Sequence, residues 1–322
     1  MSIKKIAIIG FGSIGQRHFT VIKNKFPNIE PIIVRSNKKK EDKNINCKIV
    51  YSLEDVIKLN IQAAIIASPA TFHIEQAIFL ASHNIHLLIE KPLSHNLENI
   101  DKLKKIIKKN NLICKVGYVL RNDPNLIKFK QYLDTYDIGT ILDVSITASS
   151  YLPNWRPDQN YKNTVSAKKS LGGGVILELS HEIDYIQWLF GIPKNMASII
   201  YNSNTLDIDT EDSVRVLMTS NKNYPISLFM NFCSRKNSRI CEVLTCKGVL
   251  MLDLINQQVV WYENKKKPIT SRNKFDRNII FEKQLENFFE AINNNLVKEN
   301  TLSSAIDVLK MINKIYKNQI NS

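Results

Sequence analysis

Short apolar segments alternate with amphipathic segments over the first 120 residues. The apolar segments predict five strands, at 6–9, 31–35, 63–68, 85–90 and 112–117. The amphipathic segments predict helices near 13–24, 53–59, 72–82 and 97–110. In the last helix, apolar residues recur every three or four positions and form one face. Strands that alternate with helices are typical of a doubly wound parallel sheet, so we predict a Rossmann domain over residues 1–120.

The pattern changes after about residue 120. A helix near 124–133 and a strand at 141–149 precede an irregular loop to 171, which leads into one helix from 173 to about 189. Strand-like segments then follow without intervening helices, at 196–201, 213–219, 226–232, 239–246, 249–254 and 259–262, before two helices near 279–293 and 302–316. Consecutive strands predict an open, largely antiparallel sheet. We therefore expect an α+β second domain over residues 121–322.

Composition excludes two broad classes of protein. The 322 residues are 44% apolar and 23% charged, with a mean hydropathy of −0.18, which is not the composition of a disordered chain. The longest apolar runs, such as 63–67, are far shorter than the ~20 residues of a membrane-spanning helix. We also expect no signal peptide, because only four apolar residues separate Lys5 from Gly10.

The charge and the cysteines suggest a cytoplasmic protein that binds no nucleic acid. The net charge of +14 admits a nucleic-acid or membrane surface, but the lysines are spread in short runs at 38–40, 104–105, 108–109 and 265–267. A dispersed bias favours a solvated surface, with some preference for phosphate-bearing ligands. The five cysteines are scattered and odd in number, which predicts reduced thiols and no metal site.

A glycine-rich loop follows the first predicted strand. Gly10 permits a tight turn, Gly12 lets a pyrophosphate approach the backbone, and Gly15 lets the next helix pack closely on the strand. The N–H groups at the start of that helix, at Ser13 and Ile14, attract an anion. The loop predicts a dinucleotide site, and an ordinary strand–helix turn is the alternative.

The end of the second predicted strand bears on the choice of dinucleotide. An acidic residue there would bind the ribose 2′-hydroxyl of NAD and repel a 2′-phosphate. This chain has Arg35 and Ser36, which can pair with a phosphate and donate a hydrogen bond to it. The sequence therefore favours NADP over NAD, unless Arg35 is an ordinary surface residue.

Glu90-Lys91-Pro92 lies at the carboxyl end of the fourth predicted strand, at the edge where open α/β sheets bind ligands. Pro92 restricts Lys91 to an extended conformation, and X-Pro bonds are where cis peptides occur. This arrangement directs the Lys91 ammonium toward a hydroxyl or carbonyl of a substrate. A surface lysine before a turn is the alternative.

A histidine flanked by carboxylates follows three consecutive glycines at 172–174. On one helix, Glu178, His181 and Asp184 share a face because they are three residues apart. The carboxylates orient the imidazole and raise its proton affinity, which suits a general base. The glycines let the chain pass close to a ligand. A histidine with only a structural role is the alternative.

In this order, the motifs resemble the Gfo/Idh/MocA family of NAD(P)-dependent oxidoreductases, whose best-known members act on sugars and inositols. The resemblance extends over at least residues 3–190 and includes the glycine loop, the Glu-Lys-Pro turn and the His-x-x-Asp helix. Other matching positions are Ser68, Pro69, His73, Gly117, Tyr118, Arg121 and Pro124.

The resemblance implies roles for these residues. Lys91 and His181 would be the catalytic pair, and Lys91 would also bind the substrate. The remaining cofactor-binding residues would be Ser68, Pro69, His73 and Glu90, and the remaining substrate-binding residues would be Tyr118, Arg121, Glu178 and Asp184. Many members carry an Asp four residues before the histidine, so Glu178 is interpreted as an orienting or sugar-binding group. Asp184 is then the expected partner of His181.

The loop at 151–161 is rich in groups that suit a sugar or sugar phosphate. Trp155 offers a stacking face, and Arg156 offers a guanidinium for a phosphate or carboxylate. A packed loop between domains is the alternative.

The predicted activity is hydride transfer between nicotinamide and a secondary alcohol of a sugar, inositol or sugar nucleotide. The resemblance also implies a homodimer or homotetramer. Two other functions stay open. One is a non-catalytic NAD(P)-binding regulator, and the other is an enzyme whose bound nicotinamide is reduced only transiently during elimination or glycoside cleavage.

Overall fold

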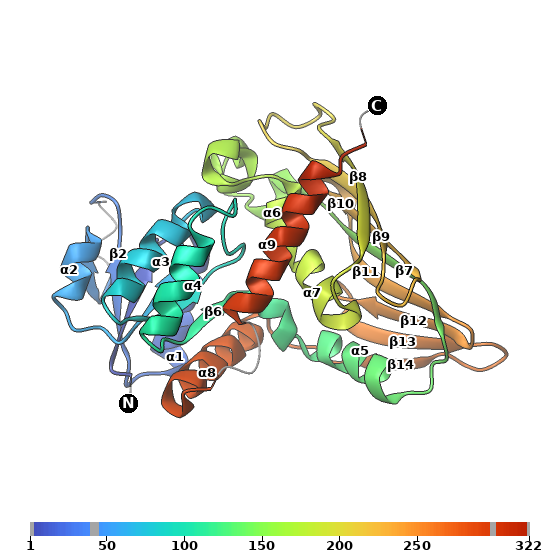
Figure 1. Cartoon of the computed structure of the whole chain (residues 1–322), viewed down its shortest axis with the longest axis horizontal. Helices are drawn as coiled ribbons and strands as arrows, with labels where there is room; N and C mark the ends of the chain where they lie inside the picture. The colour runs from blue at the N-terminus through green and yellow to red at the C-terminus, as the bar shows by residue number, and fades with distance from the viewer. Residues whose placement is uncertain (1–2, 39–44, 297–300, 321–322) are drawn as a thin grey trace. The chain divides into compact units, whose positions relative to one another are not determined.

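The computed structural model describes residues 3–38, 45–296 and 301–320 (Figure 1). The chain folds into two compact units: unit 1 is made of residues 1–119 and 276–309, and unit 2 of residues 120–275 and 310–322. The segment 276–309 was predicted in the second domain but folds with the first. Lys39 and Lys40 of the first lysine run lie outside the described residues.

Unit 1 is built on a six-stranded parallel sheet with the order β3-β2-β1-β4-β5-β6. The strands are β1 (Lys5–Ile9), β2 (Glu30–Val34), β3 (Lys48–Val50), β4 (Ala63–Ile66), β5 (His86–Ile89) and β6 (Cys114–Val116). The strand order reverses between β1 and β4, which is where doubly wound sheets bind ligands. The predicted Rossmann fold is confirmed, and β3 is an addition.

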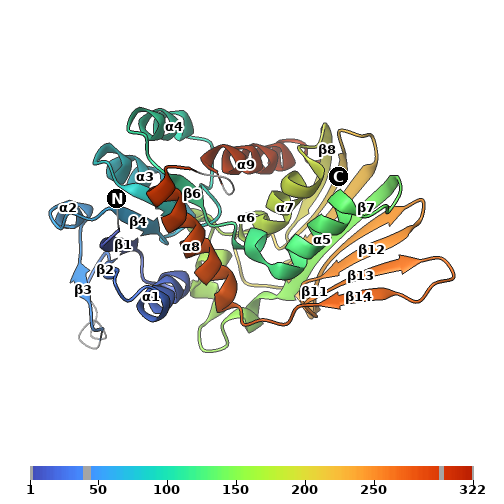
Figure 2. The ribbon, with the colours of Figure 1, turned by 90° about the horizontal axis from the view of Figure 1, so that it is seen from below.

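Helices cover both faces of this sheet (Figure 2). They are α1 (Ser13–Lys25), α2 (Leu53–Ile57), α3 (His73–Ser82), α4 (Ile100–Lys109) and α8 (Asn278–Asn294). Because both faces are covered, the central strands are almost wholly apolar, and Ile6, Ile8 and Ile65 are fully buried. Phe26 at the end of α1 packs edge-on against Phe289 of α8, with ring centroids 4.9 Å apart. That contact places α8 in unit 1.

Unit 2 contains an eight-stranded sheet with the order β14-β13-β12-β11-β7-β10-β9-β8. The strands are β7 (Ile141–Tyr151), β8 (Asn195–Tyr201), β9 (Ser213–Thr219), β10 (Pro225–Asn231), β11 (Cys233–Thr245), β12 (Gly248–Asp253), β13 (Gln258–Glu263) and β14 (Ile269–Arg272). All neighbouring pairs are antiparallel except β10 with β7. The largely antiparallel sheet is confirmed, and β14 is an addition.

One face of this sheet is packed and the other is open. The helices of unit 2 are α5 (Pro124–Thr135), α6 (Val175–Glu178) and α7 (Ser180–Phe190), together with the second half of α9 (Leu302–Lys317). Along β9 and β10, buried residues alternate with residues that are partly or fully exposed, as expected for a sheet covered on one side. Among the described residues, no helix is long and apolar enough to cross a membrane.

The predicted helix at 173–189 is wrong in one respect, because it is two helices. Leu179 separates α6 from α7, and the N–H of Glu182 bonds to the Leu179 carbonyl only three residues back, which interrupts the helical hydrogen-bond ladder. Glu178 therefore does not share a helix with His181 and Asp184. The loop predicted before it contains short 3₁₀ turns at Leu152–Trp155, Tyr161–Asn163, Val165–Ala167 and Lys169–Leu171.

Candidate active site

The glycine loop is packed against the end of β4. Gly10 has a φ of +90°, and a Cβ on it would lie 2.8 Å from backbone atoms of Ala67 and Ser68. A Cβ on Gly15 would lie 2.1 Å from the Gly10 carbonyl oxygen. Gly12 differs, because it is exposed and has open space where a Cβ would be. Two glycines are thus required by internal packing, and the third leaves the backbone open to a ligand.

The first turn of α1 is available to an anion. Within the described residues, no side chain caps this helix and no acidic residue lies in its first turn, whereas Lys23 and Lys25 lie in its last turn. Gly12 and Ser13 are exposed at the rim of the loop. The N–H groups of Ser13 and Ile14, together with the helix dipole, fit a pyrophosphate.

Arg35 lies beside the glycine loop. Its guanidinium carbon is 5.4 Å from the centre of the Phe11 ring, and its backbone N–H bonds to the Val50 carbonyl. Ser36 is exposed. The structure therefore brings the residue proposed for phosphate selectivity to the same end of the sheet as the loop proposed for the pyrophosphate.

His73 lies inside the protein and connects two loops. Its side chain contacts the Ser68 carbonyl oxygen through Nε2 at 2.8 Å and the Pro92 carbonyl oxygen through Nδ1 at 2.9 Å. Burial lowers the pKa of His73, although both carbonyls oppose this shift. A neutral imidazole donates from only one nitrogen, so one of the two contacts is not a full hydrogen bond. His73 is therefore placed to fix the backbone of Ser68. A cofactor-binding role for His73 itself stays a prediction.

The Glu-Lys-Pro turn follows β5 at the same sheet edge. Glu90 is buried, and its Oε1 lies 2.6 Å from Nε2 of His18 on α1. Its Oε2 accepts the N–H of Lys91 at 3.3 Å. Lys91 is half-buried, and the Lys91–Pro92 peptide is cis. Sequence reasoning missed His18, although it shares the buried face of α1 with Gly15.

Two ion pairs, one buried and one partly buried, anchor α7 in unit 2. Asp184 accepts two hydrogen bonds from Arg121, at 2.6 and 2.9 Å. Glu182 accepts two from Arg239, at 2.6 and 3.0 Å. Sequence reasoning assigned Asp184 to His181 and overlooked the second pair. Both oxygens of Asp184 bond to Arg121, so the structure gives these two residues an internal role in addition to any contact with substrate.

The space beside the glycines that precede α6 is filled by other atoms of the protein. A Cβ on Gly173 would lie 2.3 Å from the Val165 carbonyl oxygen, and one on Gly174, whose φ is +109°, would overlap the Glu211 carboxylate. Glu211 accepts hydrogen bonds from the Ile176 N–H at 3.2 Å and from Tyr316 at 3.0 Å. Burial raises the pKa of Glu211. The expectation that these glycines make room for a ligand is therefore corrected for Gly173 and Gly174.

The other predicted substrate residues have varied surroundings. His181 and Glu178 are half-buried, whereas Tyr118 is almost fully buried. Trp155 donates its Nε1–H to Ser150 at 2.8 Å and packs edge-on against Phe232. Its ring therefore has a packing role of its own inside unit 2. Within the described residues, no group of three or more His, Cys, Asp or Glu side chains is arranged to hold a metal ion.

Comparison with known proteins identifies the family. Residues 4–118 match the model of an oxidoreductase family with an NAD-binding Rossmann fold, and residues 126–251 match the model of the GFO/IDH/MocA C-terminal domain. This chain belongs to the Gfo/Idh/MocA oxidoreductases. Both halves of the family's architecture are therefore present in it.

Curated Gfo/Idh/MocA relatives include two dehydrogenases of sugars and inositols. The chain is 26% identical over 226 residues to glucose-6-phosphate 3-dehydrogenase of Bacillus subtilis, an alignment that covers 67% of this chain and 62% of that protein. It is also 26% identical to myo-inositol 2-dehydrogenase of Thermotoga maritima, over 58% of this chain and 55% of that protein. These alignments therefore span only about half to three-fifths of each relative.

Solved Gfo/Idh/MocA structures match the chain almost from end to end. Levoglucosan dehydrogenase in complex with NADH and levoglucosan has a TM-score of 0.85 at 17% identity, covering 98% of this chain and 96% of that one. The WlbA dehydrogenase of Bordetella pertussis, in complex with NADH and UDP-GlcNAcA, has a TM-score of 0.84 at 18% identity, covering 99% and 96%. At this level of identity the likeness establishes the fold.

Proposed function

We propose that the protein transfers a hydride between a nicotinamide dinucleotide and a secondary alcohol of a sugar, inositol or sugar nucleotide. One observation carries the proposal. The carboxyl edge of the six-stranded sheet presents both an uncapped glycine loop after β1 and Lys91 after β5. The first suits an anionic dinucleotide, and the second supplies a cation at the edge where such sheets bind ligands.

The residues at the start of α1 fit the cofactor. The N–H groups of Ser13 and Ile14 would bind the pyrophosphate, and Gly12 would let it approach the backbone. Ser68, at the end of β4, is kept in place by His73 and is proposed to line the same site. When bound, the nicotinamide supplies the hydride acceptor.

The chain's own side chains would stabilise the charge on the substrate oxygen and accept the hydroxyl proton. In the oxidising direction, the Lys91 ammonium stabilises the negative charge that develops on the substrate oxygen. His181 takes the hydroxyl proton, for which a half-buried imidazole is suited. The relatives named above act on sugars or inositols, which supports a polyhydroxylated substrate. A panel of such compounds, followed by the absorbance of reduced nicotinamide, tests the proposal, and no turnover with either cofactor would reject it.

NADP is the proposed cofactor. The guanidinium of Arg35 lies against Phe11 of the glycine loop, and the exposed Ser36 hydroxyl is next to it in the chain. Exposed Lys38, whose Nζ is 5.7 Å from the centre of the Tyr51 ring, adds positive charge after β2. A 2′-phosphate would be attracted by this group of side chains.

The Arg35→Asp variant tests this preference. Because a hydrogen bond to a charged group contributes about 1.5–3 kcal/mol, the Kd for NADPH is expected to rise ~10–100-fold while that for NADH changes much less. Titration by nicotinamide fluorescence measures both. Lys102→Asp on α4, an exposed position with the same charge change, is the control. Tighter binding of NADH than of NADPH by the unmodified protein would reject the role of Arg35 and Ser36.

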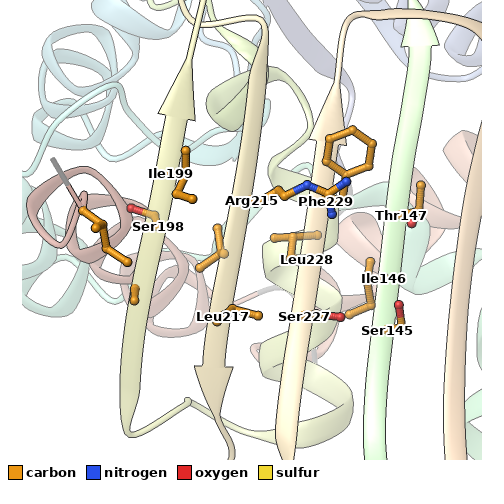
Figure 3. A pocket seen from close by; sticks show the side chains of 13 residues that line it. Ser145, Ile146, Thr147, Ser198, Ile199, Arg215, Leu217, Ser227, Leu228 and Phe229 are labelled. Carbon is orange, nitrogen blue, oxygen red and sulfur yellow. The ribbon is translucent and has the colours of Figure 1, made fainter. Parts of the chain in front are cut away.

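The open face of the unit 2 sheet is proposed to bind a second copy of the chain. Leu217 is 65% exposed and Ile199 is 56% exposed on this face. They line a pocket of about 200 Å³ together with Arg215, whose guanidinium lies over the Phe229 ring (Figure 3). Such a surface is typical of an interface between subunits.

The charges on this face suit pairing about a two-fold axis. The register of the strands puts Arg215 of β9 and Glu242 of β11 on the same face, on either side of β10 and β7. Both side chains are exposed. In an isologous contact, Arg215 of one copy can face Glu242 of the other, and Glu242 of the first copy can face Arg215 of the second. A homodimer, or a tetramer built from it, is therefore the proposed assembly.

The proposed location is the cytoplasm, because a reducing compartment suits the five free thiols.

Leu217→Glu is expected to convert this oligomer to a monomer, because each of the two copies then buries one carboxylate in the interface. Light scattering after size-exclusion chromatography measures the mass. Ile255→Glu, at a 53% exposed turn position between β12 and β13, is the matched control and should leave the mass unchanged. An unchanged mass of the Leu217→Glu variant would contradict the proposed interface.

A further inference from the structure

A histidine and a carboxylate that the proposed reaction does not use are buried beside the backbone of Lys91. The side chain of His18 is 0% exposed and that of Glu90 is 9% exposed, with Nε2 and Oε1 2.6 Å apart. The other oxygen of Glu90 accepts the N–H of Lys91. A continuous set of contacts therefore runs from α1 through His18 and Glu90 to Lys91.

The fold leaves a space for this carboxylate. A Cβ on Gly117 would lie 2.8–3.0 Å from the three carboxylate atoms of Glu90. The φ of Gly117 is not in the left-handed region, so its backbone conformation does not require glycine. The carboxylate itself excludes a side chain there. On the opposite side, the Glu90 N–H bonds to the Ile66 carbonyl of β4, which fixes its backbone.

His18 is held in one orientation. Its ring packs edge-on against Phe281 of α8, with centroids 5.7 Å apart. Nδ1 is buried, and among the described residues it has no hydrogen-bond partner. The tautomer with the proton on Nε2 satisfies this geometry, because Nε2–H then donates to Glu90 and Nδ1 needs no acceptor. Burying a carboxylate is costly unless it is hydrogen-bonded, so His18 and the Lys91 N–H both stabilise Glu90.

We propose that His18 and Glu90 are positioning residues that hold the backbone of Lys91 in a fixed place relative to the helix that carries the glycine loop. The inference rests on the proposed function, in which α1 binds the dinucleotide and Lys91 contacts the reacting oxygen. This positioning role would also explain why a histidine, His18, lies buried in the middle of α1. Displacement of a catalytic group by about 1 Å can cost ~10²-fold in rate, so such a link matters for turnover.

Hydrogen exchange at the Lys91 amide tests the link without cofactor or substrate. In His18→Leu, the carboxylate loses its partner, and we expect this amide to exchange ~10-fold faster than in the unmodified protein. In His18→Gln, the side-chain amide can still donate to Glu90, and exchange should stay within about threefold of the unmodified rate. Arg17→Ala is the matched control, because Arg17 contacts the same Phe281 ring but not Glu90. Equal exchange in all four proteins would overturn the proposal.

Kinetics then separate positioning from folding. For His18→Leu we expect kcat to fall ~10²-fold while the Kd for NADPH stays within about twofold, with rescue of kcat by His18→Gln. If His18→Leu does not fold, Glu90→Gln replaces it: this variant keeps the volume but leaves one acceptor oxygen for two donors, and the same changes are expected. Parallel losses in kcat and cofactor affinity, without rescue by His18→Gln, would overturn the proposal.

The two proposals fail in different ways. If the unmodified protein oxidises no sugar but the Lys91 amide still responds to His18→Leu and not to Arg17→Ala, the proposed function fails and the link stands. If the protein turns over and its Lys91 amide is indifferent to His18, the link fails and the function stands.

Discussion

Lys91→Ala is expected to lower kcat ~10²–10³-fold while the Kd for the reduced cofactor stays within about twofold of the unmodified value. The reason is that the ammonium is proposed to act on charge that develops only in the transition state, whereas the loop at 10–15 is proposed to bind the dinucleotide. Steady-state kinetics and a fluorescence titration on the same preparation measure the two quantities.

The control for the Lys91 variant is Lys102→Ala, which removes the same charge from an exposed position on α4. It should change neither quantity. Lys91→Arg keeps a positive charge with a different shape, and it should recover only part of the lost turnover. An equal loss of turnover and of cofactor affinity in Lys91→Ala would contradict the assigned role, because it would show that Lys91 mainly supports binding.

Asp184→Ala is expected to destabilise the protein by about 3–5 kcal/mol, because it leaves the buried guanidinium of Arg121 without its carboxylate. For a unit of this size, that corresponds to a fall in Tm of roughly 6–20 °C. Thermal unfolding followed by circular dichroism measures the shift.

A double variant separates the ion pair from packing. Replacing both partners with apolar residues, in Arg121→Met with Asp184→Leu, should recover most of the lost Tm, since no charge is then left buried. Asp134→Ala breaks an exposed Lys130–Asp134 pair on α5 and should leave Tm unchanged. A Tm of Asp184→Ala equal to that of the unmodified protein would contradict the structural role given to this pair.

The local parts of the fold were predictable from the sequence because they depend on local patterns. In unit 1, apolar runs between amphipathic segments locate five of the six strands, since a parallel sheet covered on both faces needs continuous apolar strands. β3 was missed because Lys48–Val50 offers only two apolar residues and follows a polar segment, whereas the equally short β6 lies within the predicted apolar run at 112–117. The break at Leu179 was missed for another reason: the apolar residues continue from α6 into α7, and the interruption appears only in the backbone hydrogen bonds.

The parts that could not be predicted depend on contacts between distant residues. His18 and Glu90 are 72 positions apart, Arg121 and Asp184 are 63 apart, and no single-sequence pattern pairs them. The placement of α8 is similar, because its packing on α1 joins segments from the two ends of the chain. By contrast, Gly10 and Gly15 were correctly singled out, because a strand followed by a tight turn into a helix requires glycine at those positions.

The site is predictable where chemistry and local geometry coincide. The glycine loop, Arg35 and Lys91 follow three strands of one parallel sheet, and the carboxyl ends of parallel strands meet at one edge. The roles of Glu178 and His181 depend on surroundings that the sequence does not encode locally, and these roles stay predictions.

Transfer of deuterium from substrate to released cofactor tests the central claim most directly. A sugar of the panel that the protein consumes, as measured by loss of the sugar itself, is deuterated at the carbon that bears the reacting hydroxyl, and it is incubated with the protein and excess NADP⁺ or NAD⁺. The account predicts that the label appears in free reduced nicotinamide, in an amount equal to the ketone formed. Recovery of the label in the sugar-derived product, with no net reduced nicotinamide, would contradict it and identify a reaction in which the cofactor is reduced only transiently.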